Sequence, residues 1–112
     1  MKRFEKILLA VDFSDYSEVA CEYALSLAQS FDSSLLVLHV INEPVDLRGF
    51  YVPHISFEQL EQEIETGAVK MLETFCNENL KDFSSFETSV VTGVPYEEII
   101  RVATEQESSL IV

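Results

Sequence analysis

The chain alternates between short, nearly uninterrupted apolar runs and longer stretches whose apolar positions recur every three or four residues. Residues 6–11, 34–41 and 110–112 are apolar at almost every position, which predicts strands covered on both faces of a sheet. Residues 86–92 alternate apolar and polar side chains for much of their length, which is typical of an edge or half-exposed strand. The pattern therefore predicts four strands.

Three predicted helices separate these strands. The first covers residues 16–31 and can be capped by Ser14 or Asp15, the second begins after the cap residue Ser56, and the third covers residues 96–106 after Pro95. The positions expected to face the core are Ala20, Tyr23, Ala24, Leu27, Ala28 and Phe31 in the first helix, Leu60, Ile64, Ala68, Met71, Leu72 and Phe75 in the second, and Ile99, Ile100, Val102 and Ala103 in the third.

Strands and helices alternate along the whole chain, and this order predicts an α/β fold: an open, Rossmann-like parallel sheet with helices on both faces. Two strands of the buried type beside one alternating strand favour the spatial order 3-2-1-4. In such a sheet ligands bind in the crevice beyond the carboxyl ends of the strands, where the direction of winding reverses. The crevice is expected between Asp12 and the residues that follow Val112.

A long connection occupies residues 42–55, with Pro44, Gly49 and Pro53 inside it. Its length and lack of periodic apolar positions predict the most mobile part of the chain, suited to a lid or a contact surface. Phe50, Tyr51 and Val52 are expected to cover the edge of the core or a partner.

Composition narrows the function classes. The length of 112 residues predicts one domain, and no apolar run approaches the ~18 residues of a membrane span. The start does not resemble a secretion signal, so the expected location is the cytoplasm. A net charge of -13, with scattered bases, gives no reason to expect a nucleic-acid or membrane partner. Cys21 and Cys76 lack metal or redox spacing and are expected to be plain core or boundary thiols.

Asp12 is the strongest candidate for a functional residue, because an acid at the end of a buried strand must find hydrogen-bond donors. It could cap the turn that follows, or accept hydrogen bonds from the ribose of a ligand, and the pattern leaves both interpretations open. No glycine-rich loop follows the first strand, so phosphates are not bound there in the dinucleotide manner. No catalytic motif or metal-ligand spacing is present; His39 is expected to be structural, and His54 has no assignable role.

Several separate segments, in order, resemble the universal stress protein family across the whole chain. They are Ile7 to Ser14, Ser17, Ala20, Tyr23-Ala24, Leu27-Ala28, Leu38-His39-Val40, Gly93-Val94-Pro95, Ile99 or Ile100, Ala103 and Leu110-Ile111-Val112.

The resemblance implies a site for ATP or AMP formed by Ala10, Val11, Asp12, Phe13 and Val40. In it Asp12 contacts the adenosine, Ala10 and Val11 line the base, and Val40 binds it through its backbone. The family also implies a fifth strand and usually a homodimer. Its glycine-rich phosphate loop belongs directly after Val112, so residues 1–112 are expected to be one domain that is incomplete at its C-terminus. The acidic surface opposes phosphates unless backbone amides or a cation such as Mg²⁺ offset the charge.

Three functions follow as hypotheses. The first is a stress-response protein with an adenine nucleotide as regulatory ligand and at most weak ATP hydrolysis. The second is a dimeric adaptor of the same fold that needs no nucleotide. The third is a phosphoacceptor receiver domain, which would need an aspartate at the end of the third strand, where Thr92-Gly93 stands.

Overall fold

A sheet of four parallel strands forms the centre of the computed structural model, which describes residues 5–42 and 57–112. The sheet has the order β3-β2-β1-β4, and every neighbouring pair is parallel. Its strands are β1 (Lys6–Ala10), β2 (Ser34–Asn42), β3 (Phe86–Gly93) and β4 (Leu110–Ile111). The predicted α/β fold and the predicted 3-2-1-4 order are both confirmed.

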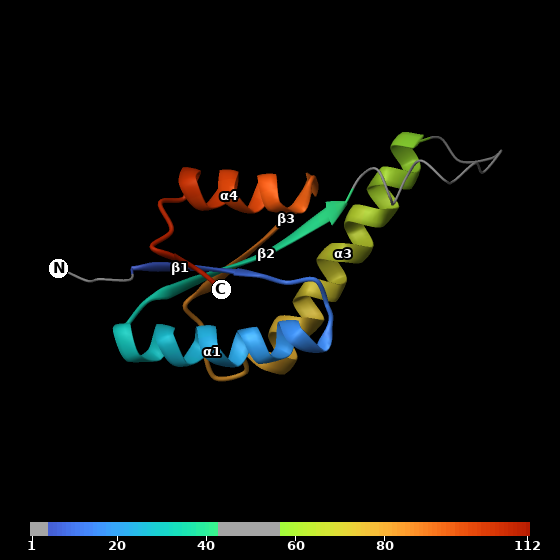
Figure 1. Ribbon diagram of the computed structural model, residues 1–112. Helices are drawn as coiled ribbons and strands as arrows, with labels where there is room; N and C mark the ends of the chain where they lie inside the picture. The colour runs from blue at the N-terminus through green and yellow to red at the C-terminus, as the bar shows by residue number, and fades with distance from the viewer. Residues whose placement is uncertain (1–4, 43–56) are drawn as a thin grey trace.

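Helices cover both faces of this sheet (Figure 1). The described helices are α1 (Asp15–Phe31), α3 (Phe57–Asn79) and α4 (Pro95–Glu105). Of these described helices, α1 and α3 lie on one face and α4 lies on the other. Pro95 occupies the start of α4, as predicted, because its missing N–H costs nothing there.

Two hydrophobic cores result from this arrangement. Successive side chains of a strand point to opposite faces, so Ile7, Leu9 and Val11 pack under α1 and α3, while Leu8 packs under α4. Ile7, Leu8 and Leu9 have 0% exposed surface. Both cysteines are free and buried within the α1/α3 core, in agreement with the sequence.

Four side chains that were expected to face the core are exposed instead. They are Tyr23, Phe31, Met71 and Ile100. In α1 the buried face consists of the small residues Ser17, Cys21, Ala24 and Ala28. Small side chains let the helix lie close to the sheet, so the buried stripe is narrower than the apolar stripe of the sequence, and large residues at its margin remain in solvent.

The predicted long connection lies almost entirely outside the described residues, as do Phe50, Tyr51, Val52 and the predicted cap Ser56. Asn42, its first residue, belongs to β2. No helix within residues 5–42 and 57–112 has the length and apolar character needed to cross a membrane.

The turn from β3 into α4 depends on Gly93. Its φ of +157° is a conformation that residues with a side chain rarely adopt. A Cβ at this position would lie 2.8 Å from Cγ of Glu98, in the first turns of α4. Glycine is therefore required both by the backbone and by the close approach of the helix.

We predict that Gly93→Ala lowers the free energy of unfolding by about 1–3 kcal/mol, because of the strained φ and the contact with Glu98. Urea denaturation followed by circular dichroism measures this. Gly67→Ala is the matched control: nothing lies within 4 Å of its Cβ, and in the middle of α3 it should stabilise by roughly 0.5–1 kcal/mol. Adding Glu98→Ala to Gly93→Ala should recover part of the loss; no recovery would assign the whole effect to the backbone.

Candidate functional site

Asp12 lies at the carboxyl end of the central strand β1, as predicted. The strand ends at Ala10, and the Val11 N–H still donates to the Leu38 carbonyl of β2 at 2.8 Å. On the other side the Ala10 N–H donates to the Val112 carbonyl at 3.3 Å. Asp12 and Val112 therefore stand at the same edge of the sheet, on either side of the expected crevice.

One oxygen of the Asp12 carboxylate organises the turn into α1. Oδ1 accepts from the Ser14 N–H at 2.9 Å, the Ser14 hydroxyl at 2.5 Å and the Ser17 hydroxyl at 2.7 Å. Ser17 in turn accepts from the Asp12 N–H at 2.9 Å, so the two residues are joined twice. The predicted cap Ser14 does occupy the N-cap position, but its hydroxyl bonds to Asp12 rather than to the helix amides.

These hydrogen bonds stabilise the charged form of Asp12. They lower its pKa to about 2, with the Ser14 hydroxyl contributing most and the Ser17 hydroxyl next. Asp12 is therefore a fixed anion over the physiological pH range.

The second oxygen of the carboxylate, Oδ2, accepts no hydrogen bond from any of the described residues. Asp12 as a whole is exposed. Asp12 thus holds the turn with one oxygen, while the other has no hydrogen-bond partner among the described residues. The two interpretations of its sequence position are compatible.

Phe13 adopts an unusual backbone conformation directly after Asp12. Its φ is +66°, the left-handed region, which costs a residue with a Cβ roughly 1–2 kcal/mol. Its ring contacts His39, with centroids 4.5 Å apart, and meets Phe75 of α3 edge-on at 6.5 Å. Aromatic pairs of this kind are worth about 0.5–1.5 kcal/mol each, so the packing offsets the strain.

His39 has a structural role at this edge. Its Nδ1 lies 2.7 Å from the Val11 carbonyl, and because a carbonyl only accepts, Nδ1 carries the proton in this contact. The ring is half-buried against Phe13. The sequence expectation of a satisfied histidine agrees with this placement.

The five predicted site residues divide between the two faces of the sheet. Ala10 and Val40 both pack against the core under α4. Val40 lies two residues beyond Leu38, the partner of Ala10, and is therefore level with Asp12. Val11 and Phe13 belong to the opposite core, so their side chains do not join Ala10 and Val40.

Sequence reasoning gave Ser17 no role beyond the resemblance, yet it holds Asp12 in place from a position 4% exposed. The spacing Asp12-Ser14-Ser17 is the signal that could have indicated this network.

An apolar hollow of ≈340 Å³ lies beside Phe13 between α1 and α3. No group of three or more potential metal ligands gathers anywhere in the described part of the chain.

A parallel 3-2-1-4 sheet, with an acid fixed at the carboxyl end of its central strand, defines the class as Rossmann-like α/β. The universal stress protein family model matches residues 3–112, and the chain belongs to that family. Its third strand ends at Gly93, so the receiver hypothesis has no phosphoacceptor aspartate.

Individual relatives and solved structures resemble the chain over nearly its whole length. The chain is 34% identical over 114 residues to the universal stress protein YxiE of Bacillus subtilis, covering 97% of this chain and 77% of that protein. The solved structure of MJ0577 from Methanocaldococcus jannaschii shares the fold, with a TM-score of 0.80, 23% identity and coverage of 98% and 74%. A universal stress protein crystallised in complex with cAMP has a TM-score of 0.66, 17% identity and coverage of 96% and 70%.

The lowered pKa of Asp12 leads to a pH-dependent prediction. Its stabilising effect is complete above the unfolded pKa of 3.8 and is lost as the pH falls toward the folded pKa of about 2. Because solvent screens this exposed group, we expect Asp12→Asn to cost about 1 kcal/mol of unfolding free energy at pH 7, and almost nothing at pH 2. Urea denaturation at several pH values measures the difference.

Asp15→Asn is the control. It also removes one negative charge, in the first turn of α1, but it breaks no side-chain hydrogen bond among the described residues. It should show only the few tenths of a kcal/mol expected from the helix dipole. An equal, equally pH-dependent loss in both variants would contradict a specific role of the Ser14 and Ser17 bonds.

Proposed function

We propose that this universal stress protein binds an adenine nucleotide as a regulatory ligand at the carboxyl edge of β1 and β2. The observation that carries the proposal is the Asp12 carboxylate, fixed through Oδ1 and open at Oδ2. A charged acceptor held in one orientation suits the hydroxyls of a ribose, because charge-assisted hydrogen bonds are stronger than neutral ones.

Ala10 and Val40 supply the apolar part of the proposed site. Both are half-buried on the face under α4, next to Asp12 in the register of the sheet. An adenine base could lie against these side chains while the Val40 backbone binds its polar edge. Val11 and Phe13 would contribute through the backbone and by fixing the turn, since their side chains pack in the opposite core.

The phosphate groups need a partner beyond these residues. With a net charge of -13, the protein repels polyphosphates unless backbone amides or a cation such as Mg²⁺ are close by. A glycine-rich loop after Val112 would supply the amides and would decide between ATP and AMP. The described side chains offer no group of metal ligands, so a cation would depend chiefly on the nucleotide itself.

The family supports this proposal in general terms, and the relative solved with cAMP shows that this fold accommodates an adenine nucleotide in at least one case. We further propose that residues 1–112 belong to one domain, acting as a homodimer in the cytoplasm and without an enzymatic step beyond weak ATP hydrolysis.

A nucleotide-independent adaptor is the second candidate, and an exposed stripe on α1 favours it. Tyr16, Val19 and Tyr23 are 85%, 50% and 67% exposed and recur along one side of the helix. Large apolar side chains gathered in solvent are typical of a protein interface. An adaptor would use this stripe and leave Asp12 as a turn residue only.

Isothermal titration calorimetry with ATP, AMP and cAMP separates these functions. We expect binding to the native polypeptide, including any residues that follow Val112, and a loss of about ten- to one-hundredfold in affinity for Asp12→Ala, equivalent to one charge-assisted hydrogen bond. The isolated residues 1–112 should bind several powers of ten more weakly, since two or three phosphate contacts would be missing.

Asp15→Ala serves as the matched control and should leave the affinity unchanged, while circular dichroism checks that each variant is folded. Failure of the native polypeptide to bind any of the three nucleotides would favour the adaptor. Unchanged affinity in Asp12→Ala would place the nucleotide elsewhere.

A further inference from the structure

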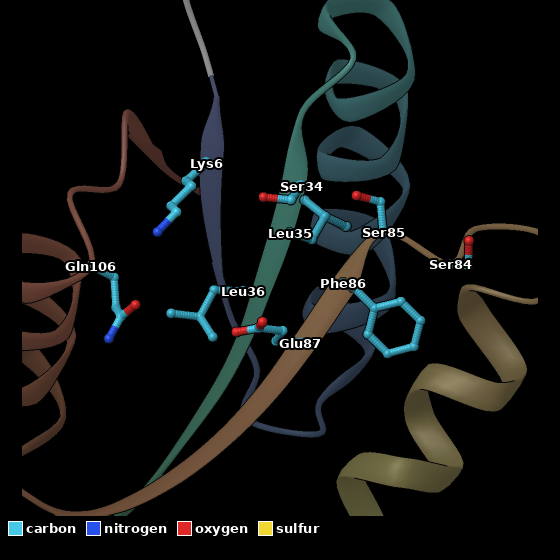
Figure 2. A pocket seen from close by; sticks show the side chains of 9 residues that line it. All are labelled: Lys6, Ser34, Leu35, Leu36, Ser84, Ser85, Phe86, Glu87 and Gln106. Atoms are coloured by element: carbon cyan, nitrogen blue, oxygen red, sulfur yellow. The ribbon is translucent and has the colours of Figure 1, made fainter.

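A second hollow lies at the opposite edge of the sheet, where β1, β2 and β3 begin (Figure 2). Its volume is ≈300 Å³, the lower end of the range for small-molecule sites. Lys6 lines it from the first position of β1, whereas Asp12 follows the last position of the same strand. The hollow is therefore separate from the proposed nucleotide site.

The strand register explains why polar residues gather there. Parallel strands begin at the same edge, so the polar residues that precede or open each strand meet. Lys6 is paired with Ser34, and the pairing of Leu35 with Phe86 places Ser34 beside Ser85. A row of an ammonium and two hydroxyl groups crosses three strands.

The same face carries an apolar floor and an acid. Leu36 packs against the core under α4 and is paired with Glu87. Side chains alternate along a strand, so Lys6 and Ser34 share the face of Leu36 and Glu87. Gln106, directly after α4, also lines the hollow and lies on the same side of β1 as the Lys6 side chain in Figure 2.

Lys6 and Glu87 have no charged partner among the residues that the structure describes. Within the described ranges, neither side chain forms a hydrogen bond or an ion pair, with each other or with any further residue. From the strand spacing and rise per residue, their Cα atoms are roughly 12 Å apart. Because the lysine side chain is long, its ammonium group can come closer to the Glu87 carboxylate than the two Cα atoms are. One small bipolar molecule can then bridge the two charged groups with a hydrogen bond at each end.

We propose that this hollow binds a small zwitterion of the α-amino acid type. Its carboxylate pairs with Lys6, its ammonium group pairs with Glu87, and an apolar side chain lies on Leu36. The Ser34 hydroxyl donates to the Glu5 carbonyl at 3.3 Å and can therefore accept from the ligand, while the Gln106 amide can donate or accept. A simple anion would leave Glu87 beside a like charge, and a simple cation would do the same to Lys6. Both residues are exposed, so each ion pair contributes little and we expect weak binding.

Nuclear magnetic resonance titration with L-leucine tests this directly. We expect saturable shifts of the backbone amides of Ser34, Leu36, Glu87 and Gln106. Isocaproate, which lacks the ammonium group, and isoamylamine, which lacks the carboxylate, should each bind at least about tenfold more weakly. Equal binding of isocaproate would show a plain anion site, and no saturable shift up to the solubility of leucine would overturn the proposal.

Exchanging the two charges is a second test of the zwitterion site. Lys6→Met and Glu87→Gln should each weaken leucine binding about tenfold, whereas the double exchange Lys6→Glu with Glu87→Lys should restore most of it, because a zwitterion can bind turned around. Lys70→Met and Glu97→Gln, on α3 and α4, are controls that should change nothing. Circular dichroism checks the fold of each variant. Failure of the exchanged pair to recover binding would contradict the bipolar ligand.

Discussion

Burial of β1 on both faces is the constraint on which the rest of the structure depends. Three of its five residues have no exposed surface, and each large apolar side chain buried in this way contributes about 1.5–3 kcal/mol. A strand covered on both sides needs neighbours at both edges and helices on both faces. β2 and β4 supply the edges, while α1, α3 and α4 supply the cover. The end of such a strand is the first place where a polar side chain can reach solvent.

The chain must reverse sharply at that point to enter α1, and Asp12 and Phe13 together stabilise this turn. Phe13 adopts the left-handed conformation and anchors its ring on His39 and Phe75, while one oxygen of Asp12 holds Ser14 and Ser17. Because Oδ2 has no partner among the described residues, the turn that completes the fold also holds a fixed anion at the edge where we propose that the nucleotide binds. Stability and the proposed function therefore rely on the same carboxylate.

The sequence predicted the fold well because the burial of a strand on one or both faces determines how its apolar residues are spaced. Two of the three apolar runs marked the central strands β1 and β2, and the alternating run marked β3 as an edge. The third run forms β4 at the other edge of the described sheet, where Ile111 is exposed rather than covered. Helix faces were predicted less well: Tyr23, Met71 and Ile100 continue an apolar stripe but lie past the width that the sheet can cover. At the site, the position of Asp12 was predictable. The left-handed Phe13, the contact of its tilted ring with His39 and the grouping of Lys6 with Glu87 depend on tertiary contacts and strand register, which local pattern does not encode.

A crystal structure of the native polypeptide with AMP tests the central claim most directly, because it locates the ligand relative to both oxygens of Asp12. The account predicts that a ribose hydroxyl lies within hydrogen-bond distance of Oδ2, that Oδ1 keeps its bonds to Ser14 and Ser17, and that the base lies against Ala10 and Val40. An AMP molecule bound away from this edge, or an Oδ2 that makes no contact with the bound nucleotide, would contradict it.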